Sequence, residues 1–92
     1  MKVMFFVDRY FFLEKQVHEY MKVLVVKTPE QVLHYFEKQL MRYQRLLLLQ
    51  NLDAYPDSVI TSIHYLIKDY SSAIHKVQTY LSYQKELQLL ND

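Results

Sequence analysis

Histidines close to glutamates are the first residues in this sequence that could support acid–base or metal chemistry. Glu14 and His18 are four residues apart, Glu30 and His34 repeat that spacing, and Glu37 follows three residues later. Bundle metal sites combine carboxylate and imidazole from adjacent helices, but the di-metal version requires Glu-x-x-His with the side chains directed inward. Both pairs here have the wider spacing, and they lie beside the rows of apolar residues that would form a helical core, not within them. We therefore expect surface pairs, with no metal and no other cofactor.

The remaining candidates for catalysis are weaker still. His64 and His75 flank the C-terminal apolar segment, and neither has a serine or carboxylate at a spacing that indicates a catalytic triad. The sequence contains no cysteine, which removes thiolate chemistry, disulfides and cysteine-ligated zinc. It also contains no glycine, and phosphate loops, dinucleotide fingerprints and nucleophile elbows all depend on glycine. We expect no catalytic residues and a protein that is not an enzyme.

A basic stripe is the clearest polar pattern. Lys38, Arg42 and Arg45 follow His34 at spacings of four, four and three, with tyrosines on neighbouring rows. Such a stripe suits either an acidic protein partner or nucleic acid. The net charge is only +1, from 11 Lys and Arg against 10 Asp and Glu, so the whole chain exerts little long-range attraction on phosphates. Three charges on the outer face of a helix are usually only its solvated face; as a binding surface, the stripe favours an acidic protein partner, and nucleic acid is the alternative.

The elements that carry these residues are marked by the two prolines. Thr28 is suited to the N-cap of a helix, Pro29 to its first position, and Gln31 completes a capping box with Thr28. In the second break, "QNLDAYPDS", Asn51 can end one helix and Pro56 can open the next. The chain therefore divides into three segments of 20 or more residues each.

Each segment carries apolar residues at alternating spacings of three and four, the heptad-like pattern of helices that pack as in a coiled coil. We call these residues the seam of each segment: Val3, Phe6, Tyr10, Leu13, Val17, Tyr20 and Leu24 in the first, Leu33, Phe36, Leu40, Tyr43 and Leu47 in the second, and Ile60, Ile63, Ile67, Tyr70, Ile74, Val77 and Leu81 in the third. The third seam is flanked by Val59, Leu66, Ala73, Tyr80 and Leu87. We predict an all-α fold: an antiparallel bundle of three helices over 3–26, 29–50 and 56–90, with a long C-terminal helix. The 92 residues are expected to form a single helical-bundle domain over 1–92.

Two alternatives compete with this fold. The stretch "KDYSSAI" could cap a new helix, and a break near Ser71 would give a four-helix bundle. The heptad phase passes through Ser71 and Ser72 without a slip, which favours one continuous helix. The stretches "KVMFFV" and "KVLVVK" are rich enough in β-branched and aromatic residues to form strands. Two strands alone are marginally stable, and no turn residues separate them from the intervening helix.

The apolar residues exceed what three short helices can bury. Leu46 to Leu49 point almost all the way round a helix, and the last helix, at ~52 Å, is longer than the ~33 Å of the one before it. The overhang would leave apolar side chains uncovered in a monomer. We therefore expect a homodimer. Its interface, shared with a second protein partner, is predicted to include Leu48, Leu49, Tyr80, Leu81, Tyr83, Leu87 and Leu90.

These observations favour a small non-catalytic interaction module: an inhibitor, adaptor or immunity-type regulator that self-associates and docks a second protein. The alternatives are a nucleic-acid-binding regulator that uses the basic stripe, and a small dimeric all-helical enzyme. Asp8 and Arg9 interrupt the N-terminal apolar run, and no stretch reaches the ~20 apolar residues of a membrane span. We therefore expect no membrane span and a cytoplasmic location.

Overall fold

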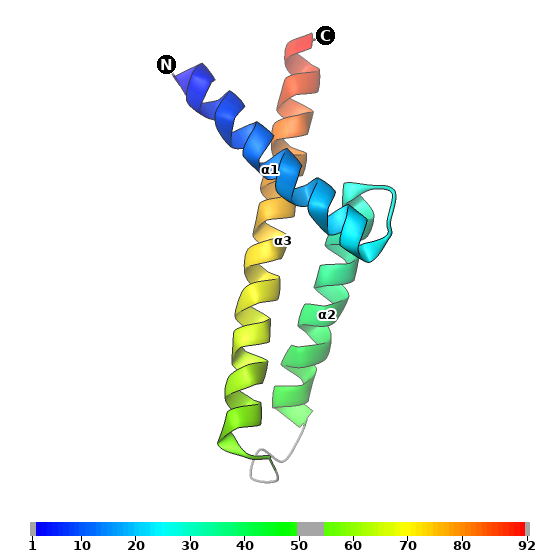
Figure 1. Cartoon of the computed structure of the whole chain (residues 1–92), viewed down its shortest axis with the longest axis vertical. Helices are drawn as coiled ribbons and strands as arrows, with labels where there is room; N and C mark the ends of the chain where they lie inside the picture. The colour runs from blue at the N-terminus through cyan, green and yellow to red at the C-terminus, as the bar shows by residue number, and fades with distance from the viewer. Residues whose placement is uncertain (1, 50–54, 92) are drawn as a thin grey trace.

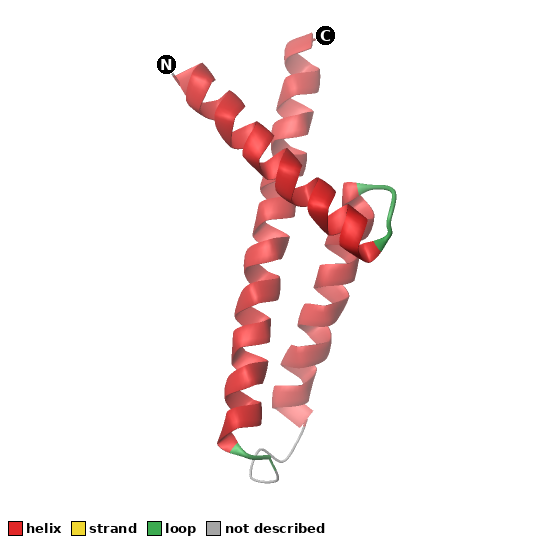
Figure 2. Cartoon of the chain, viewed as in Figure 1, coloured by secondary structure: helices red, strands yellow, loops and turns green. Residues whose placement is uncertain are grey.

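The computed structural model describes the backbone of residues 2–49 and 55–91, and the side chains within 7–48 and 55–90. Three helices account for almost all of these residues, and no strand occurs among them (Figure 2). The helices are α1 (Lys2–Leu24), α2 (Pro29–Leu49) and α3 (Asp57–Asn91). The prediction of an all-α bundle of three helices is confirmed, with boundaries within about two residues of those expected.

Helices α2 and α3 form an antiparallel hairpin, and α1 crosses both of them obliquely near the end where α2 begins (Figure 1). α3 runs without a break through Ser71 and Ser72, so the four-helix alternative does not apply. Both serines are exposed, which leaves the helix free to continue past them. The molecule is long and thin, with principal extents of 56 × 28 × 20 Å.

The start of α2 is fixed by the predicted capping box. The Gln31 amide N–H donates to Thr28 Oγ1 at 3.3 Å, and the Thr28 amide N–H donates to Gln31 Oε1 at 3.1 Å. The Lys27 amide also donates to Gln31 Oε1, at 2.8 Å. These bonds satisfy backbone donors that a helix start otherwise leaves without partners, which explains why α2 begins at Pro29.

The end of α1 is formed by backbone hydrogen bonds that no residue type in the sequence predicts. The Val26 amide donates to the Met21 carbonyl at 3.0 Å, and the Val25 amide donates to the Lys22 carbonyl at 3.3 Å. This is the Schellman arrangement, and it requires a left-handed residue at Val25, whose φ is 55°. Because the chain turns here, α1 ends at Leu24 and not at the predicted residue 26.

We expect Val25→Gly to raise the free energy of unfolding by about 1 kcal/mol. A left-handed residue with a Cβ costs roughly 1–2 kcal/mol, and the extra backbone entropy of glycine offsets about half of the gain. Val25 is 89% exposed, so the change removes almost no packing. The matched control is Val23→Gly, which lies inside α1, is 77% exposed and should cost a few tenths of a kcal/mol, the difference in helix propensity between valine and glycine. Urea denaturation followed by circular dichroism measures both, and equal destabilisation by the two would contradict the assignment.

The core lies where α1 crosses the hairpin. Val17, Val32 and Val77 are completely buried, one from each helix. The other buried residues are Leu13, Phe36, Ala73, Ile74 and Tyr80. Nearly all belong to the predicted seams or their flanks, whereas Val32 was not among the seam positions of its segment. Among the residues with described side chains, the fully packed ones therefore come from the region that all three helices share.

Aromatic rings extend this core along the hairpin. The ring of Phe36 packs edge-on against Tyr20 of α1, with centroids 5.0 Å apart, and contacts Tyr70 of α3 at 5.9 Å. Tyr70 in turn stacks on Tyr43 at 5.9 Å. Such pairs stabilise by ~0.5–1.5 kcal/mol beyond their buried area, and they tie α1, α2 and α3 to one another.

Candidate functional site

The titratable residues singled out from the sequence do not converge. His18, His34, His64 and His75 are all exposed. Within the described ranges, no three side chains of His, Cys, Asp or Glu come together as metal ligands. No polar or charged side chain is buried there either, so the described core contains no lysine or arginine that could hold an anionic substrate.

The basic stripe does form a continuous surface. Lys38, Arg42 and Arg45 are exposed and share the side of α2 opposite Phe36, which faces the core. In the part of the chain that the structure describes, none of the three forms an ion pair. The stripe therefore remains available to a partner of opposite charge.

The predicted interface residues of α3 divide into two groups. Tyr80 is 2% exposed, so this residue belongs to the chain's own core and presents no surface to a partner. The reason is tertiary: α1 places Tyr10 against it, with the rings stacked at 5.5 Å. Leu81 and Tyr83 are half-buried against the core. Leu87, further along, is half-buried, and Leu90 is 79% exposed.

The run of four leucines is only partly covered by its own chain. Leu46 and Leu47 are half-buried, whereas Leu48 is 84% exposed. The Leu49 side chain lies outside the described residues. Leu48 is near the end of α2 at the bottom of Figure 1, and Leu90 is near the end of α3 at the top. The exposed members of the predicted interface thus lie at opposite ends of a long molecule.

Exposure increases along α3 with distance from α1. Tyr80, Ala73, Leu66 and Val59 are seven residues apart and lie on one side of the helix. Tyr80 is 2% exposed and Ala73 8%, Leu66 is half-buried, and Val59 is 38% exposed. The row of apolar residues continues toward the start of α3, but α1 no longer covers it there. The part of the hairpin that lies toward Leu48 is only two helices thick, and α1 does not reach it (Figure 1).

The same change occurs along α2. Val32 is completely buried where the three helices meet, while Gln39 and Leu46, seven and fourteen residues later, are half-buried. Beyond α1, α2 and α3 cover only the sides that they turn toward each other. The sides that α1 would cover are left to solvent. Beyond α1, this side of the hairpin has no third helix on it, and its half-buried Leu66 and exposed Val59 lie beside the exposed polar residues Asp69 and Ser62.

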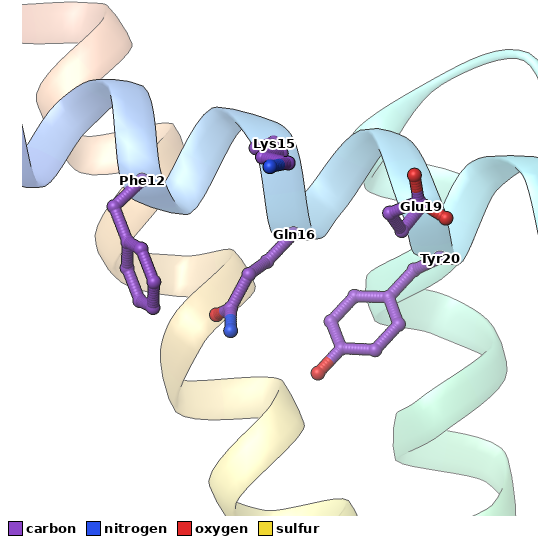
Figure 3. A pocket seen from close by; sticks show the side chains of 5 residues that line it. All are labelled: Phe12, Lys15, Gln16, Glu19 and Tyr20. Carbon is purple, nitrogen blue, oxygen red and sulfur yellow. The ribbon is translucent and has the colours of Figure 1, made fainter.

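A pocket of about 380 Å³ lies along the edge of α1 that borders this face (Figure 3). Phe12, Gln16 and Tyr20 project from α1 in the same direction, and Lys15 and Glu19 complete the lining. Phe12 is 60% exposed. All the lining residues come from one helix, so the pocket is an open depression along the side of α1 and not an enclosed cavity.

Gln16 is the chemically unusual residue of this pocket. Its Oε1 atom is buried and accepts no hydrogen bond from any residue that the structure describes. A buried acceptor without a donor costs ~1–3 kcal/mol, and such atoms are rare in folded proteins. Phe12, Gln16 and Tyr20 recur every four residues and thus occupy one helix face, but nothing in that spacing indicates that the glutamine amide is buried.

Comparisons with protein-family models, curated proteins and solved structures found no match. The functional assignment therefore depends on the surface described above. None of the described helices is long and apolar enough to cross a membrane.

Tyr80 has the most perturbed titration of the described groups. Burial is the main cause that raises the pKa of Tyr80 to about 12, and a hydrogen bond with Tyr10 and the charges of Glu14 and Glu30 add to it. Its hydroxyl oxygen accepts a hydrogen bond from Gln84 Nε2 at 2.8 Å. A neutral, hydrogen-bonded phenol in the core is a structural element and not a proton donor at neutral pH.

We expect the wild-type protein to lose about 2 kcal/mol of stability between pH 10 and pH 12 through Tyr80 alone. The unfolded phenol has a pKa of 10.0 and the folded one a pKa of about 12, so the unfolded chain releases the proton first. The contribution is complete below pH 10 and is lost as the pH rises through 12. Urea denaturation at several alkaline pH values should show a smaller loss in Tyr80→Phe than in Tyr65→Phe, because Tyr65 is 64% exposed. Equal slopes in the two variants would contradict the assignment.

Proposed function

We propose that this protein is a small non-catalytic helical interaction module that self-associates and docks a second protein. The observation that carries the proposal is the loss of cover along the hairpin, from Tyr80 at 2% exposure to Val59 at 38% on one row. An apolar row that continues beyond its own third helix is typical of a surface that another chain covers.

The exposed apolar area supports the same proposal. Among the described residues, thirteen large apolar side chains are between 36% and 89% exposed. Side chains of this type present ~150–250 Å² each when they are aromatic, so their exposed area together is on the order of 1,000 Å². A standard protein interface buries ~800 Å² on each partner. These residues are distributed over all three helices and both ends of the molecule, so a single interface uses only those that lie together.

The basic stripe provides a second, electrostatic surface. Lys38, Arg42 and Arg45 are exposed and unpaired within the described residues, which favours docking of an acidic protein surface. Nucleic acid is the alternative ligand for the same three side chains. Salt separates nucleic-acid binding through the stripe from docking through the apolar surface, because phosphate binding weakens steeply as salt is added, whereas apolar docking changes little.

We expect light scattering at micromolar concentration to give a mass near twice the 11.3 kDa of one chain. The double variant Leu48→Glu with Leu90→Glu should shift this mass toward the monomer, because a buried charge opposes association. Both leucines are at least 79% exposed, so the helical circular dichroism should not change. His64→Glu, at an exposed position on the side of α3 opposite Tyr80, is the control and should remain dimeric. A monomeric wild type would refute self-association.

A further inference from the structure

The outer side of α2 carries a row of regularly spaced residues that is separate from the seam packed into the core. Successive members are four, three, four and three residues apart: His34, Lys38, Met41, Arg45 and Leu48. These spacings keep the five side chains within about 80° of one another around the helix axis. Phe36, which contacts α1 and α3, lies on the opposite side. We call the five residues the outer row.

The chain itself leaves the outer row uncovered. All its members are exposed, and the two apolar ones, Met41 and Leu48, are 58% and 84% exposed. α1 crosses the hairpin near the start of α2, and α3 packs against the opposite side of α2 (Figure 1). Within the described residues, Lys38, Arg45 and the adjacent Arg42 form no ion pair. Both the charges and the apolar side chains of the row are therefore open to another molecule.

Positive charge is concentrated on this side of α2. Between residues 34 and 48 the chain has three basic residues, Lys38, Arg42 and Arg45, and one acidic residue, Glu37. The whole chain has 11 basic and 10 acidic residues, which leaves eight basic and nine acidic residues elsewhere. The outer row is thus a positive surface on an otherwise nearly neutral protein, and it is complementary to a partner of negative charge.

A second copy of this chain does not provide the complementary charge. Within the three helices, no two acidic residues are three or four positions apart, so the chain has no acidic row of the same spacing. If two outer rows packed in parallel, Lys38 and Arg45 would each meet their own kind. Packed antiparallel, they would meet the apolar members or His34. Neither order places a carboxylate opposite the basic residues, so the partner is a different chain.

We propose that the outer row docks a helix of another protein, in which a row of acidic residues runs beside a row of apolar residues. This inference rests on the proposed docking of a second protein and specifies the chemistry of that protein. The carboxylates of the partner helix pair with Lys38, Arg42 and Arg45, and its apolar row covers Met41 and Leu48. The alternation of four and three residues is the spacing at which two helices pack side by side, and the row extends for ~21 Å.

The apolar members of the row favour a protein over nucleic acid. Met41 and Leu48 alternate with Lys38 and Arg45, so a ligand that contacts the charges also lies over the apolar side chains. A helix with leucines beside its glutamates covers those side chains and pairs the charges in one contact. A sugar–phosphate backbone pairs the charges alone.

A synthetic acidic helix tests the proposal. The probe is a peptide of about 20 residues built from heptads, with glutamate at the first position, leucine at the fourth, and alanine and glutamine elsewhere. Two companion probes are the same peptide with lysine in place of glutamate and a DNA duplex of about 20 base pairs. Binding of each labelled probe to the full chain is measured by fluorescence anisotropy. We expect the acidic peptide to bind more tightly than either companion.

Charge reversal separates the outer row from the charge of the whole chain. Arg45→Glu should weaken binding of the acidic peptide by about tenfold, because it removes an ion pair and adds a repulsion. Lys68→Glu makes the same change at an exposed position of α3 and should leave binding unchanged. Light scattering on Arg45→Glu should give the wild-type mass, which separates loss of docking from loss of self-association. Equal weakening in the two variants would overturn the proposal, because it would show that only net charge matters.

Truncation of an apolar side chain separates a helical partner from nucleic acid. Met41→Ser should weaken binding of the acidic peptide by about fivefold, because it removes apolar surface that the leucines cover. Val23→Ser, at a position of α1 that is 77% exposed, is the control and should bind as the wild type does. Met41 is chosen because Leu48 is already part of the variant that tests self-association. Unchanged binding in Met41→Ser would contradict the apolar part of the contact.

The companion probes give the remaining outcomes. A DNA duplex that binds more tightly than the acidic peptide would overturn the proposal in favour of nucleic acid. Equal binding of the lysine peptide would overturn the charge complementarity, and absence of binding by the acidic peptide would overturn the acidic helix as the partner. None of these results affects self-association, which light scattering decides separately.

Discussion

Phe36→Ala is expected to lower the free energy of unfolding by about 3–5 kcal/mol, the usual cost of removing a buried aromatic ring. Phe36 is 7% exposed and contacts Tyr20 of α1 and Tyr70 of α3 as well as its neighbour Tyr35. Its loss leaves a cavity at the position where all three helices meet. A domain of this size has a total stability of ~5–15 kcal/mol, so the variant should lose much of it.

The control for this prediction is Tyr35→Ala. Tyr35 is the adjacent aromatic residue of α2, its ring also contacts Phe36, and it is 39% exposed. It should cost clearly less than Phe36→Ala, because water already covers part of the ring. Urea denaturation at one fixed protein concentration, followed by far-UV circular dichroism, compares the two. Equal losses would show that the core does not lie where α1 crosses the hairpin.

Ser71→Pro is expected to destabilise the protein by about 3 kcal/mol or more, because a proline inside a helix removes one backbone hydrogen bond and its ring clashes with the preceding turn. Ser71 lies in the middle of α3, which runs without a break from Asp57 to Asn91. A kink there also separates the core residues Ala73, Ile74 and Val77 from the part of α3 that packs on the end of α2.

Ser71→Ala is the matched control for the proline variant. Ser71 is exposed, so alanine removes no packing, and its better helix propensity should leave the stability unchanged or raise it by a few tenths of a kcal/mol. Thermal denaturation by circular dichroism distinguishes the two variants. If the proline were tolerated as well as the alanine, α3 would have to break at this position, as in a four-helix bundle.

The sequence by itself determined the helices and most of their inner faces. Thr28, Pro29 and Gln31 form a capping box that depends only on neighbouring residues, and the same hydrogen bonds occur in the structure. The seam positions Leu13, Val17 and Val77 are buried, because a spacing of three and four residues places apolar side chains on one side of any helix. Both signals are local and need no knowledge of the packing.

The end of α1 shows where local signals fail. Helix ends in the left-handed conformation are normally marked by glycine or asparagine, and here Val25 adopts it with a φ of 55°. No residue type announces the turn, so the helix was predicted to continue to residue 26. Met21 and Val26, which flank the turn, are partly buried against the core. This packing involves other helices, so it cannot be inferred from the neighbouring residues alone.

The position of α1 was decided only by the tertiary structure, and the candidate site depends on it. Tyr80 and Leu90 were assigned to one interface, yet α1 covers the first to 2% exposure and leaves the second at 79%. Apolar periodicity gives the direction of a side chain from its own helix axis, but burial depends on which other helix occupies that direction. The crossing is set by non-local packing, and no spacing within one helix encodes it.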